Sequence, residues 1–145
     1  MNPHVVWAAG LFEGEGCFQR NQKGASIAFG MRLVSTDRDV VEAYADVIES
    51  IVGRRPALVR RKRPQPHHKQ QFAASIGGPD AERFYEAMRP WLGQRRTATA
   101  DAIRAEVSDY QERLRSQRAQ RPSPRAARIR RYWSGRRAAD QEPLW

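Results

Sequence analysis

Two acidic side chains close to the N-terminus have the types and the position of functional rather than structural residues. The nonamer AAGLFEGEG (residues 8–16) predicts the end of a short apolar helix, with Glu13 and Glu15 in its last turn. The helix dipole makes that end negative, which disfavours carboxylates there. Gly10 and Gly14 lie inside the same helix, where each glycine costs about 1 kcal/mol relative to alanine. We therefore interpret this segment as one that accepts instability for function, with its acids placed for chemistry.

The residues after this nonamer predict the elements that must position it. Over 26–34, apolar residues alternate with small or polar ones, the period-2 pattern of a half-buried strand. Further on, apolar residues have helical spacing up to Gly53, which terminates that helix. The expected elements are a helix over Val5–Glu15, strands over Cys17–Lys23 and Ser26–Val34, a helix from Thr36 or Asp37 to Val52, strands over Ala57–Arg63 and Lys69–Ile76, and a helix capped by Asp80.

The nonamer resembles the LAGLIDADG motif of homing endonucleases, in the variant that ends Gly-Glu-Gly. Residues 9–11 match its Ala-Gly-Leu, Phe12 replaces its isoleucine, and Glu13 and Glu15 replace its two aspartates. The order of the expected elements, αββαββα, is also that of a LAGLIDADG domain, and the resemblance covers roughly residues 5–106. It implies an α+β fold whose antiparallel sheet faces DNA.

The resemblance also implies a metal-dependent site for DNA hydrolysis. Glu15 stands at the family's metal ligand, and the carbonyl of Gly14 can complete the coordination. Oxygen ligands and a phosphate substrate favour Mg²⁺, which would activate water and stabilise the leaving oxygen. Arg95 follows a Pro-aromatic-Leu run like the family's and is expected to stabilise charge at the scissile phosphate. Where the family often has Gln or Asn to position water, this chain has Thr36 or Asp37, and we take Asp37 as a catalytic candidate.

A single copy of the motif predicts a homodimer. The sequence contains no second nonamer and no internal repeat. Because family enzymes use one acid from each of two motif helices, a chain with one motif must pair to cut duplex DNA. The resemblance places Gly10, Gly14 and Glu13 at a two-fold contact between the helices. Glycines at this spacing let helices approach more closely than the usual ~8–10 Å.

Polar residues on the expected sheet form the candidate DNA surface. Amides and cations at alternate strand positions suit base and phosphate contacts. The run Arg60–Arg63 predicts a basic β-ribbon that can enter the major groove, where arginine binds guanine in a bidentate way. The pattern leaves open whether Arg60 and Lys62 or Arg61 and Arg63 face the DNA. The expected DNA-binding residues are Gln19, Asn21, Lys23, Arg32, Arg60, Arg61, Lys62, Arg63, Lys69, Gln71 and Ser75.

Composition agrees with a polyanionic partner. The 145 residues carry a net charge of +10, with 23 Arg and 3 Lys, although a GC-rich genome alone would also favour arginine. There is no stretch of ~20 apolar residues and no signal peptide, so we expect a cytoplasmic protein with no membrane partner. The single Cys17 excludes an intramolecular disulfide and argues against a cysteine zinc site. His67 and His68 fall in a proline-flanked segment that predicts a solvated turn.

The C-terminal part predicts a long helix and a basic tail. Apolar residues between Thr97 and Arg118 have helical spacing, and we expect that face to pack on its own domain rather than form a coiled coil. We therefore divide the chain into a LAGLIDADG-type domain with its C-terminal helix, residues 1–120, and an Arg-rich flexible tail, residues 121–145. The tail predicts nonspecific affinity for phosphates, with a short helix that orders on DNA as the alternative.

These observations favour a site-specific, Mg²⁺-dependent homing-type DNA endonuclease that acts as a homodimer. Its gene would belong to an intron, a phage or another mobile element, in a bacterium or an organelle. The alternatives on the same scaffold are a non-catalytic DNA-binding regulator and an RNA-splicing cofactor. Retention of acids at both Glu13 and Glu15 argues against the regulator, because a relic would tolerate their loss.

Overall fold

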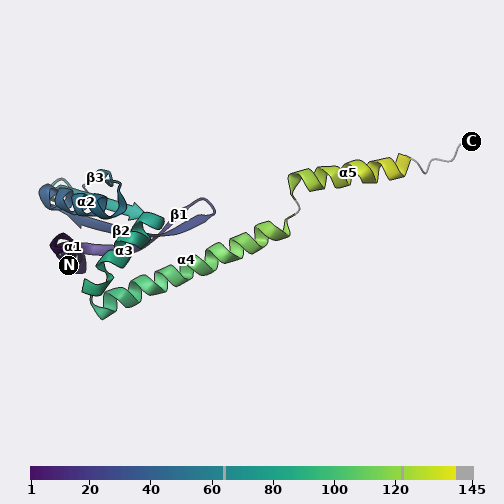
Figure 1. Cartoon of the computed structure of the whole chain (residues 1–145). Helices are drawn as coiled ribbons and strands as arrows, with labels where there is room; N and C mark the ends of the chain where they lie inside the picture. The colour runs from purple at the N-terminus through teal and green to yellow at the C-terminus, as the bar shows by residue number, and fades with distance from the viewer. Residues whose placement is uncertain (64, 122, 140–145) are drawn as a thin grey trace, which may run out of the picture. The chain divides into compact units, whose positions relative to one another are not determined.

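The first 110 residues fold as helices packed on an antiparallel sheet (Figure 1). The structure is a computed structural model that describes residues 1–63, 65–121 and 123–139. The order of elements in the first part of the chain is the expected αββαββα, which confirms the α+β fold class. The elements are α1 (Pro3–Glu15), β1 (Gly16–Lys23), β2 (Ser26–Ser35), α2 (Arg38–Val52), β3 (Leu58–Arg61), β4 (Gln71–Gly77), α3 (Pro79–Met88), the 3-10 turn η1 (Arg89–Trp91), α4 (Gln94–Gln120) and α5 (Pro124–Ala139).

The sheet has two faces of different character. Its strand order is β1-β2-β4-β3, and each neighbouring pair is antiparallel. Because side chains alternate along a strand, the register assigns each residue to one face. Phe29, Met31 and Leu33 are buried on the face across which α2 and α3 pack (Figure 1). Arg32 lies on the opposite face, which we call the open face.

Aromatic rings join α1 to the covered face of the sheet and α2 to α3. Phe12 of α1 lies 4.9 Å from Phe18 of β1, and Phe18 lies 5.6 Å from Phe29, measured between ring centroids. Tyr44 of α2 packs edge-on against Phe84 of α3 at 5.6 Å. The Tyr44 hydroxyl is buried without a hydrogen-bond partner in the described part of the chain, and burial raises the pKa of this phenol well above its ordinary value. Burial of these large apolar side chains is the main source of stability in the domain.

The third strand is shorter than the sequence predicts. Strand β3 spans four residues, Leu58–Arg61, so Lys62 and Arg63 lie in the connection that follows it. Lys69 likewise precedes β4 instead of belonging to it. Strand β4 begins at Gln71, which pairs with Arg61, so the charged residues after Arg61 have no partner in β4.

The cap of α3 is also different from the expected one. Its N-cap is Gly78, whose φ of 65° lies in the left-handed region that favours glycine. Asp80 does not cap the helix. It lies in the first helical turn, where an acid complements the helix dipole, and its carboxylate binds Arg54 at 2.6 Å.

The chain forms two compact units, Met1–Tyr110 and Gln111–Trp145, with the boundary inside α4. In the first unit, Ala100 and Val107 of α4 are buried and the Tyr110 hydroxyl donates to the carbonyl of Ala25 at 3.2 Å. The apolar face of α4 therefore packs on its own domain up to Tyr110, as expected. The second unit contains α5, in the segment for which the sequence favours a flexible tail and leaves a short helix as the alternative. None of the helices described here has the length and apolar composition needed to cross a bilayer.

Candidate nucleic-acid cleavage site

The last turn of α1 brings Glu15 to the surface where β1 begins. Gly16 makes this turn: its N–H donates to the carbonyl of Phe12, and a Cβ added to Gly16 would lie 2.2 Å from the Phe12 ring. No larger residue fits at that position without moving the ring. Glu15 is exposed, and no described residue forms a hydrogen bond or an ion pair with its carboxylate. This side chain can therefore bind a ligand from outside the chain.

Arg96, in the first turns of α4, holds the end of α1 in place. Its Nη2 donates to the carbonyl of Glu13 at 2.6 Å, and its Nη1 donates to the carbonyl of Gly16 at 2.9 Å. Carbonyls at a helix C-terminus lack partners within the helix, and the dipole favours a cation there. The guanidinium also lies 5.9 Å from the Phe12 ring centroid, and the side chain is only 20% exposed. One arginine thus fixes the backbone on both sides of Gly14 and Glu15.

Glu13 completes the same contact from the side of α1. Its Oε1 accepts a hydrogen bond from the N–H of Gly93 at 2.5 Å, and its Oε2 lies 3.8 Å from Arg96 Nε. A Cβ on Gly93 would lie 3.2 Å from that oxygen, so only glycine leaves it full room. Two residues along an α-helix differ by about 200° in direction, so Glu13 and Glu15 face different sides. The carboxylate that the sequence assigns to the dimer contact is bound within its own chain.

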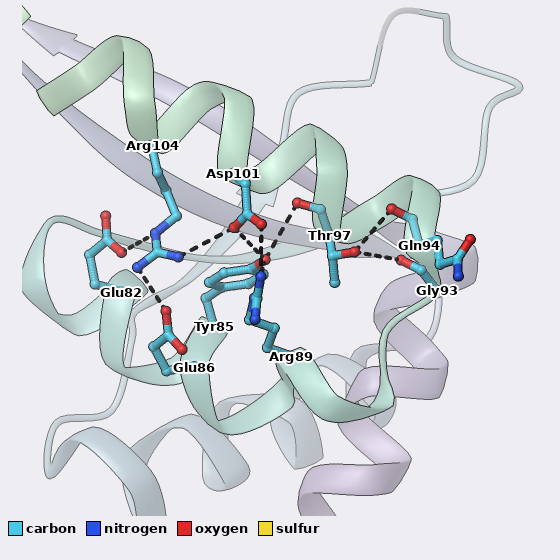
Figure 2. Close-up of polar contacts among 9 residues, drawn as sticks. All are labelled: Glu82, Tyr85, Glu86, Arg89, Gly93, Gln94, Thr97, Asp101 and Arg104. Atoms are coloured by element: carbon cyan, nitrogen blue, oxygen red, sulfur yellow. Dashed lines mark hydrogen bonds and ion pairs between the residues drawn. The ribbon is translucent and has the colours of Figure 1, made fainter. Parts of the chain in front are cut away.

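The beginning of α4 is in turn fixed to α3 by a polar cluster (Figure 2). Asp101 accepts hydrogen bonds from the Tyr85 hydroxyl at 2.9 Å and from Arg89 Nη2 at 2.9 Å. The hydrogen bond from Arg89 holds the pKa of the Asp101 carboxyl below its ordinary value, and burial raises the pKa of the Tyr85 phenol. This cluster joins the end of α3 to α4 one turn after Arg96.

A second arginine extends the cluster along α4. Arg104 contacts Glu82 at 2.5 Å and Glu86 at 2.7 Å, and its guanidinium lies 4.9 Å from the Tyr85 ring centroid (Figure 2). These ion pairs therefore connect α3 to α4 at a second point. Because α4 is held at two points on α3, the position of Arg96 against α1 is set by packed elements and not by a loop.

The open face carries most of the polar residues expected to contact DNA. Asn21 of β1 lies over two glycines: a Cβ on Gly30 would be 2.2 Å from its Nδ2, and one on Gly77 would be 3.0 Å away. Arg32 Nε donates to Ser75 Oγ at 3.0 Å across the β2–β4 pair. Glycines beneath Asn21 and a hydroxyl beside Arg32 give both side chains defined positions. Gln19, Lys23 and Gln71 lie on this face by register.

The register of β3 answers a question that the sequence left open. Val59 and Arg61 pair with Ala73 and Gln71, which places both on the open face. Arg60 lies on the other face at the sheet edge, where its Nε donates to Gln70 Oε1 at 2.9 Å. Arg61, and not Arg60, therefore joins Arg32 and its neighbours. Val59 is an exposed apolar residue among them.

The β3–β4 connection encloses a basic pocket at one end of the sheet. Four cations and three polar side chains share it, and this density of positive charge suits a phosphate group. His68 belongs to this set, although the sequence predicts only a solvated turn for it. The lining residues are Thr36, Arg61, Lys62, Arg63, His68, Lys69 and Gln71.

The remaining predicted catalytic residues, Asp37 and Arg95, form no hydrogen bond or ion pair with Glu15. Gly16 of β1 pairs with Leu33 of β2, so Asp37 follows β2 at the same end of the sheet as Glu15. The Asp37 carboxylate makes no capping bond to α2. Arg95 is exposed beside Arg96. The sequence does not predict that Arg96 contacts α1. Arg95 and Arg96 are adjacent, and no local pattern shows which of the two faces that helix.

The outer face of α1 is open. A Cβ added to Gly10 or Gly14 would meet nothing within 4 Å, so neither glycine is required by packing inside this chain. Trp7, one turn before Gly10, is 41% exposed. A flat stripe of two glycines beside an exposed tryptophan is typical of a surface that another backbone approaches closely.

The described residues of one chain do not form a complete metal site. No three His, Cys, Asp or Glu side chains among them gather closely enough to hold an ion. The exposed Glu15 carboxylate offers oxygen atoms of the kind that Mg²⁺ prefers as ligands.

Comparison with known proteins agrees with the geometry of the fold. A search of curated proteins gave no match. The structure is similar to that of the LAGLIDADG homing endonuclease I-GzeII in complex with its DNA target, with a TM-score of 0.52 and 11% identity. The match covers 85% of this chain and 39% of that one, so this chain spans about two fifths of the length of I-GzeII. Residues 7–89 match the model of the LAGLIDADG-like domain, and the chain belongs to this family, a family of DNA endonucleases.

Proposed function

We propose that the protein is a site-specific DNA endonuclease that makes Mg²⁺-dependent double-strand cuts as a homodimer. The observation that carries the proposal is the exposed Glu15 carboxylate, held at the end of the motif helix of a LAGLIDADG domain. Arg96 and Gly16 fix its backbone, yet no described residue binds the carboxylate itself. A rigid backbone that presents an unused acid is suited to catalysis.

The proposed dimer follows from the need to cut both strands of a DNA duplex. Each chain supplies one Glu15, and duplex cleavage needs an acid for each strand. The match covers 39% of I-GzeII, so two copies would correspond to roughly four fifths of one chain of that enzyme. Gly10 and Gly14 leave the open surface of α1 that a symmetric helix pair requires, with Trp7 beside it.

In that dimer, each residue has a defined task. The two Glu15 carboxylates would hold Mg²⁺, with the carbonyl of Gly14 as a further ligand. When bound, the cation supplies activation of water and neutralisation of phosphate charge. Arg95 offers an exposed cation for charge that develops on the phosphate. Asp37, at the same end of the sheet, is the candidate for orienting water.

The open face and the basic pocket would bind the duplex. Arg32, Arg61 and Gln71 present a cation–amide surface for base edges, and the pocket around Lys69 offers phosphate contacts. Val59 is placed for apolar contact with a thymine methyl group. Specificity would therefore reside in the sheet and cleavage in the end of α1.

The test combines cleavage with one conservative substitution. The substrate is the genomic DNA on both sides of the gene, joined so that any intervening insertion is removed. The wild-type protein should make site-specific double-strand cuts only with Mg²⁺. Glu15→Gln keeps the side-chain size and removes its charge, so cleavage should be lost while metal-free DNA binding and folded stability are retained or improved. Glu112→Gln, at another exposed glutamate, should cut like the wild type.

The outcomes separate the nuclease from its nearest rival. If Glu15→Gln cuts as fast as the wild type, Glu15 is not the metal ligand and the assignment fails. Site-specific binding without cuts under any divalent ion would indicate a DNA-binding regulator. One feature favours that rival: the chain has Thr36 or Asp37 where the family often has an amide that positions water.

A further inference from the structure

Most of the net positive charge lies outside the first unit. Residues 111–145 contain ten arginines and three acids, a net +7 of the +10 for the whole chain. Helix α5 alone carries six arginines and no acid. A charge of this density needs a polyanionic partner or lowers the stability of the segment by self-repulsion.

Helix α5 is specified by its own local sequence. Ser123 accepts a hydrogen bond from the N–H of Ala126 at 3.0 Å, and Pro124 occupies the first helical position, where its missing N–H is harmless. Charge opposes this helix, however. Arg125 lies at the positive end of the dipole, and Arg128 repeats its charge three residues later on the same side. A capped helix whose charges destabilise it is typical of a segment selected for a charged partner.

One side of α5 exposes an apolar edge. Ile129, Tyr132 and Trp133 have the i, i+3, i+4 spacing that gathers side chains on one face, and they are 50%, 57% and 53% exposed. The two aromatic rings lie 5.5 Å apart, edge to face. Amphipathic aromatic residues beside arginines are enriched where proteins bind partners.

We propose that α5 binds in a groove of duplex DNA. A helix in the major groove has phosphates on both flanks and base edges ahead of it. Arginines on all sides of α5 match the two flanks, and the edge of Ile129, Tyr132 and Trp133 matches the groove floor. The DNA partner rests on the proposed function, but the binding of α5 requires no cleavage.

The same charge distribution is unfavourable for the main alternative, an anionic membrane surface. A helix that lies on a bilayer needs a broad apolar face and confines its cations to the other side. In α5 the arginines at positions 125, 128, 130 and 131 point in different directions around the helix axis, and Arg125 and Arg128 flank the apolar edge.

The experiment compares two charge-matched variants of the full chain. The triple variant R125Q/R128Q/R131Q removes three charges from α5, and R113Q/R115Q/R118Q removes three from the second unit outside it. Affinity for a long random-sequence duplex is measured against salt concentration, in the absence of metal. Each lost phosphate contact should lower the salt slope by about 0.9, so the α5 variant should lose up to ~2.7 log units per tenfold change in salt. The control variant should lose much less, and Trp133→Ala should weaken binding with little change in slope.

Three results would overturn the proposal. The first is an equal slope for the α5 variant and the wild type. The second is an equal loss in both triple variants, which would show diffuse charge instead of a helix-specific contact. The third is a loss of affinity for phosphatidylserine vesicles in the α5 variant, with the same DNA affinity as the wild type. A wild-type protein that binds DNA through α5 but never cuts it would defeat the nuclease proposal and leave this one standing.

Discussion

Substitution of Arg96 is the most direct test of how the end of α1 is held. Arg96→Ala removes two hydrogen bonds, to the carbonyls of Glu13 and Gly16, together with contact over the Phe12 ring. Because the side chain is only 20% exposed, water cannot replace these contacts fully. The Glu13 carboxylate would keep only its hydrogen bond from Gly93.

The expected loss can be estimated from these contacts. A hydrogen bond from a charged donor contributes about 1.5–3 kcal/mol, so two bonds at the lower value give about 3 kcal/mol for Arg96→Ala. At ~4 °C per kcal/mol this corresponds to a fall of about 12 °C in Tm. Arg96→Lys keeps the charge but cannot reach both carbonyls with one planar group, so about half of the loss should remain. Arg95→Ala, at the exposed neighbour, should stay within about 0.5 kcal/mol of the wild type.

Urea and thermal unfolding, followed by tryptophan fluorescence, measure these differences directly. The expected order of stability is wild type and Arg95→Ala together, then Arg96→Lys, then Arg96→Ala. In cleavage assays Arg95→Ala should slow the reaction and leave DNA affinity nearly intact, because in our proposal that residue stabilises charge that develops on the phosphate. The reasoning is refuted if Arg96→Ala is as stable as Arg95→Ala, since Arg96 would then not hold the α1–β1 turn.

Four further substitutions test other parts of the structure. Gly14→Leu fills the open surface of α1 and should convert a dimer into a monomer in sedimentation; a variant that remains dimeric would place the interface elsewhere. Tyr44→Phe removes a buried hydroxyl without a described partner and should raise the free energy of unfolding by about 1 kcal/mol, whereas Tyr85→Phe, which breaks a hydrogen bond to Asp101, should lower it. The lowered pKa of Asp101 gives stability that is present above its ordinary value of 3.8 and is lost as pH falls through the folded pKa. Acid unfolding of Asp101→Asn should therefore depend less on pH than that of the wild type, and an unchanged profile would contradict the assignment.

The fold could be predicted from local signals in the sequence. Gly24 and Gly53 both adopt positive φ where a turn and a helix end were expected, at 60° and 79°. The alternation along β2 assigns its apolar residues to the covered face, as the structure confirms. These features depend on residues close together in the chain, which is why pattern and propensity identify them.

The parts that could not be predicted depend on contacts between distant segments. The length and register of β3 are set by pairing with β4. The sequence pattern predicts Asp80 as the N-cap of α3, whereas the N-cap is Gly78. An acid near the start of a helix is compatible with either the cap or the first turn. Arg96 reaches across 80 and 83 positions in sequence to the carbonyls of Gly16 and Glu13, and no local pattern predicts those contacts.

The two acids of the motif show how such contacts divide roles within one short segment. Glu13 and Glu15 have the same side chain and nearly the same place in the sequence, and each is unfavourable at a helix C-terminus. Glu13 is compensated inside the chain, by the N–H of Gly93 and by Arg96. Glu15 receives no compensation from any described residue, so its cost can be offset only by a ligand from outside the described chain, which in our proposal is a metal ion shared with a second copy. A sequence motif contains both acids, but only the packing of α4 against α1 identifies which of them is bound within the chain and which can bind a ligand.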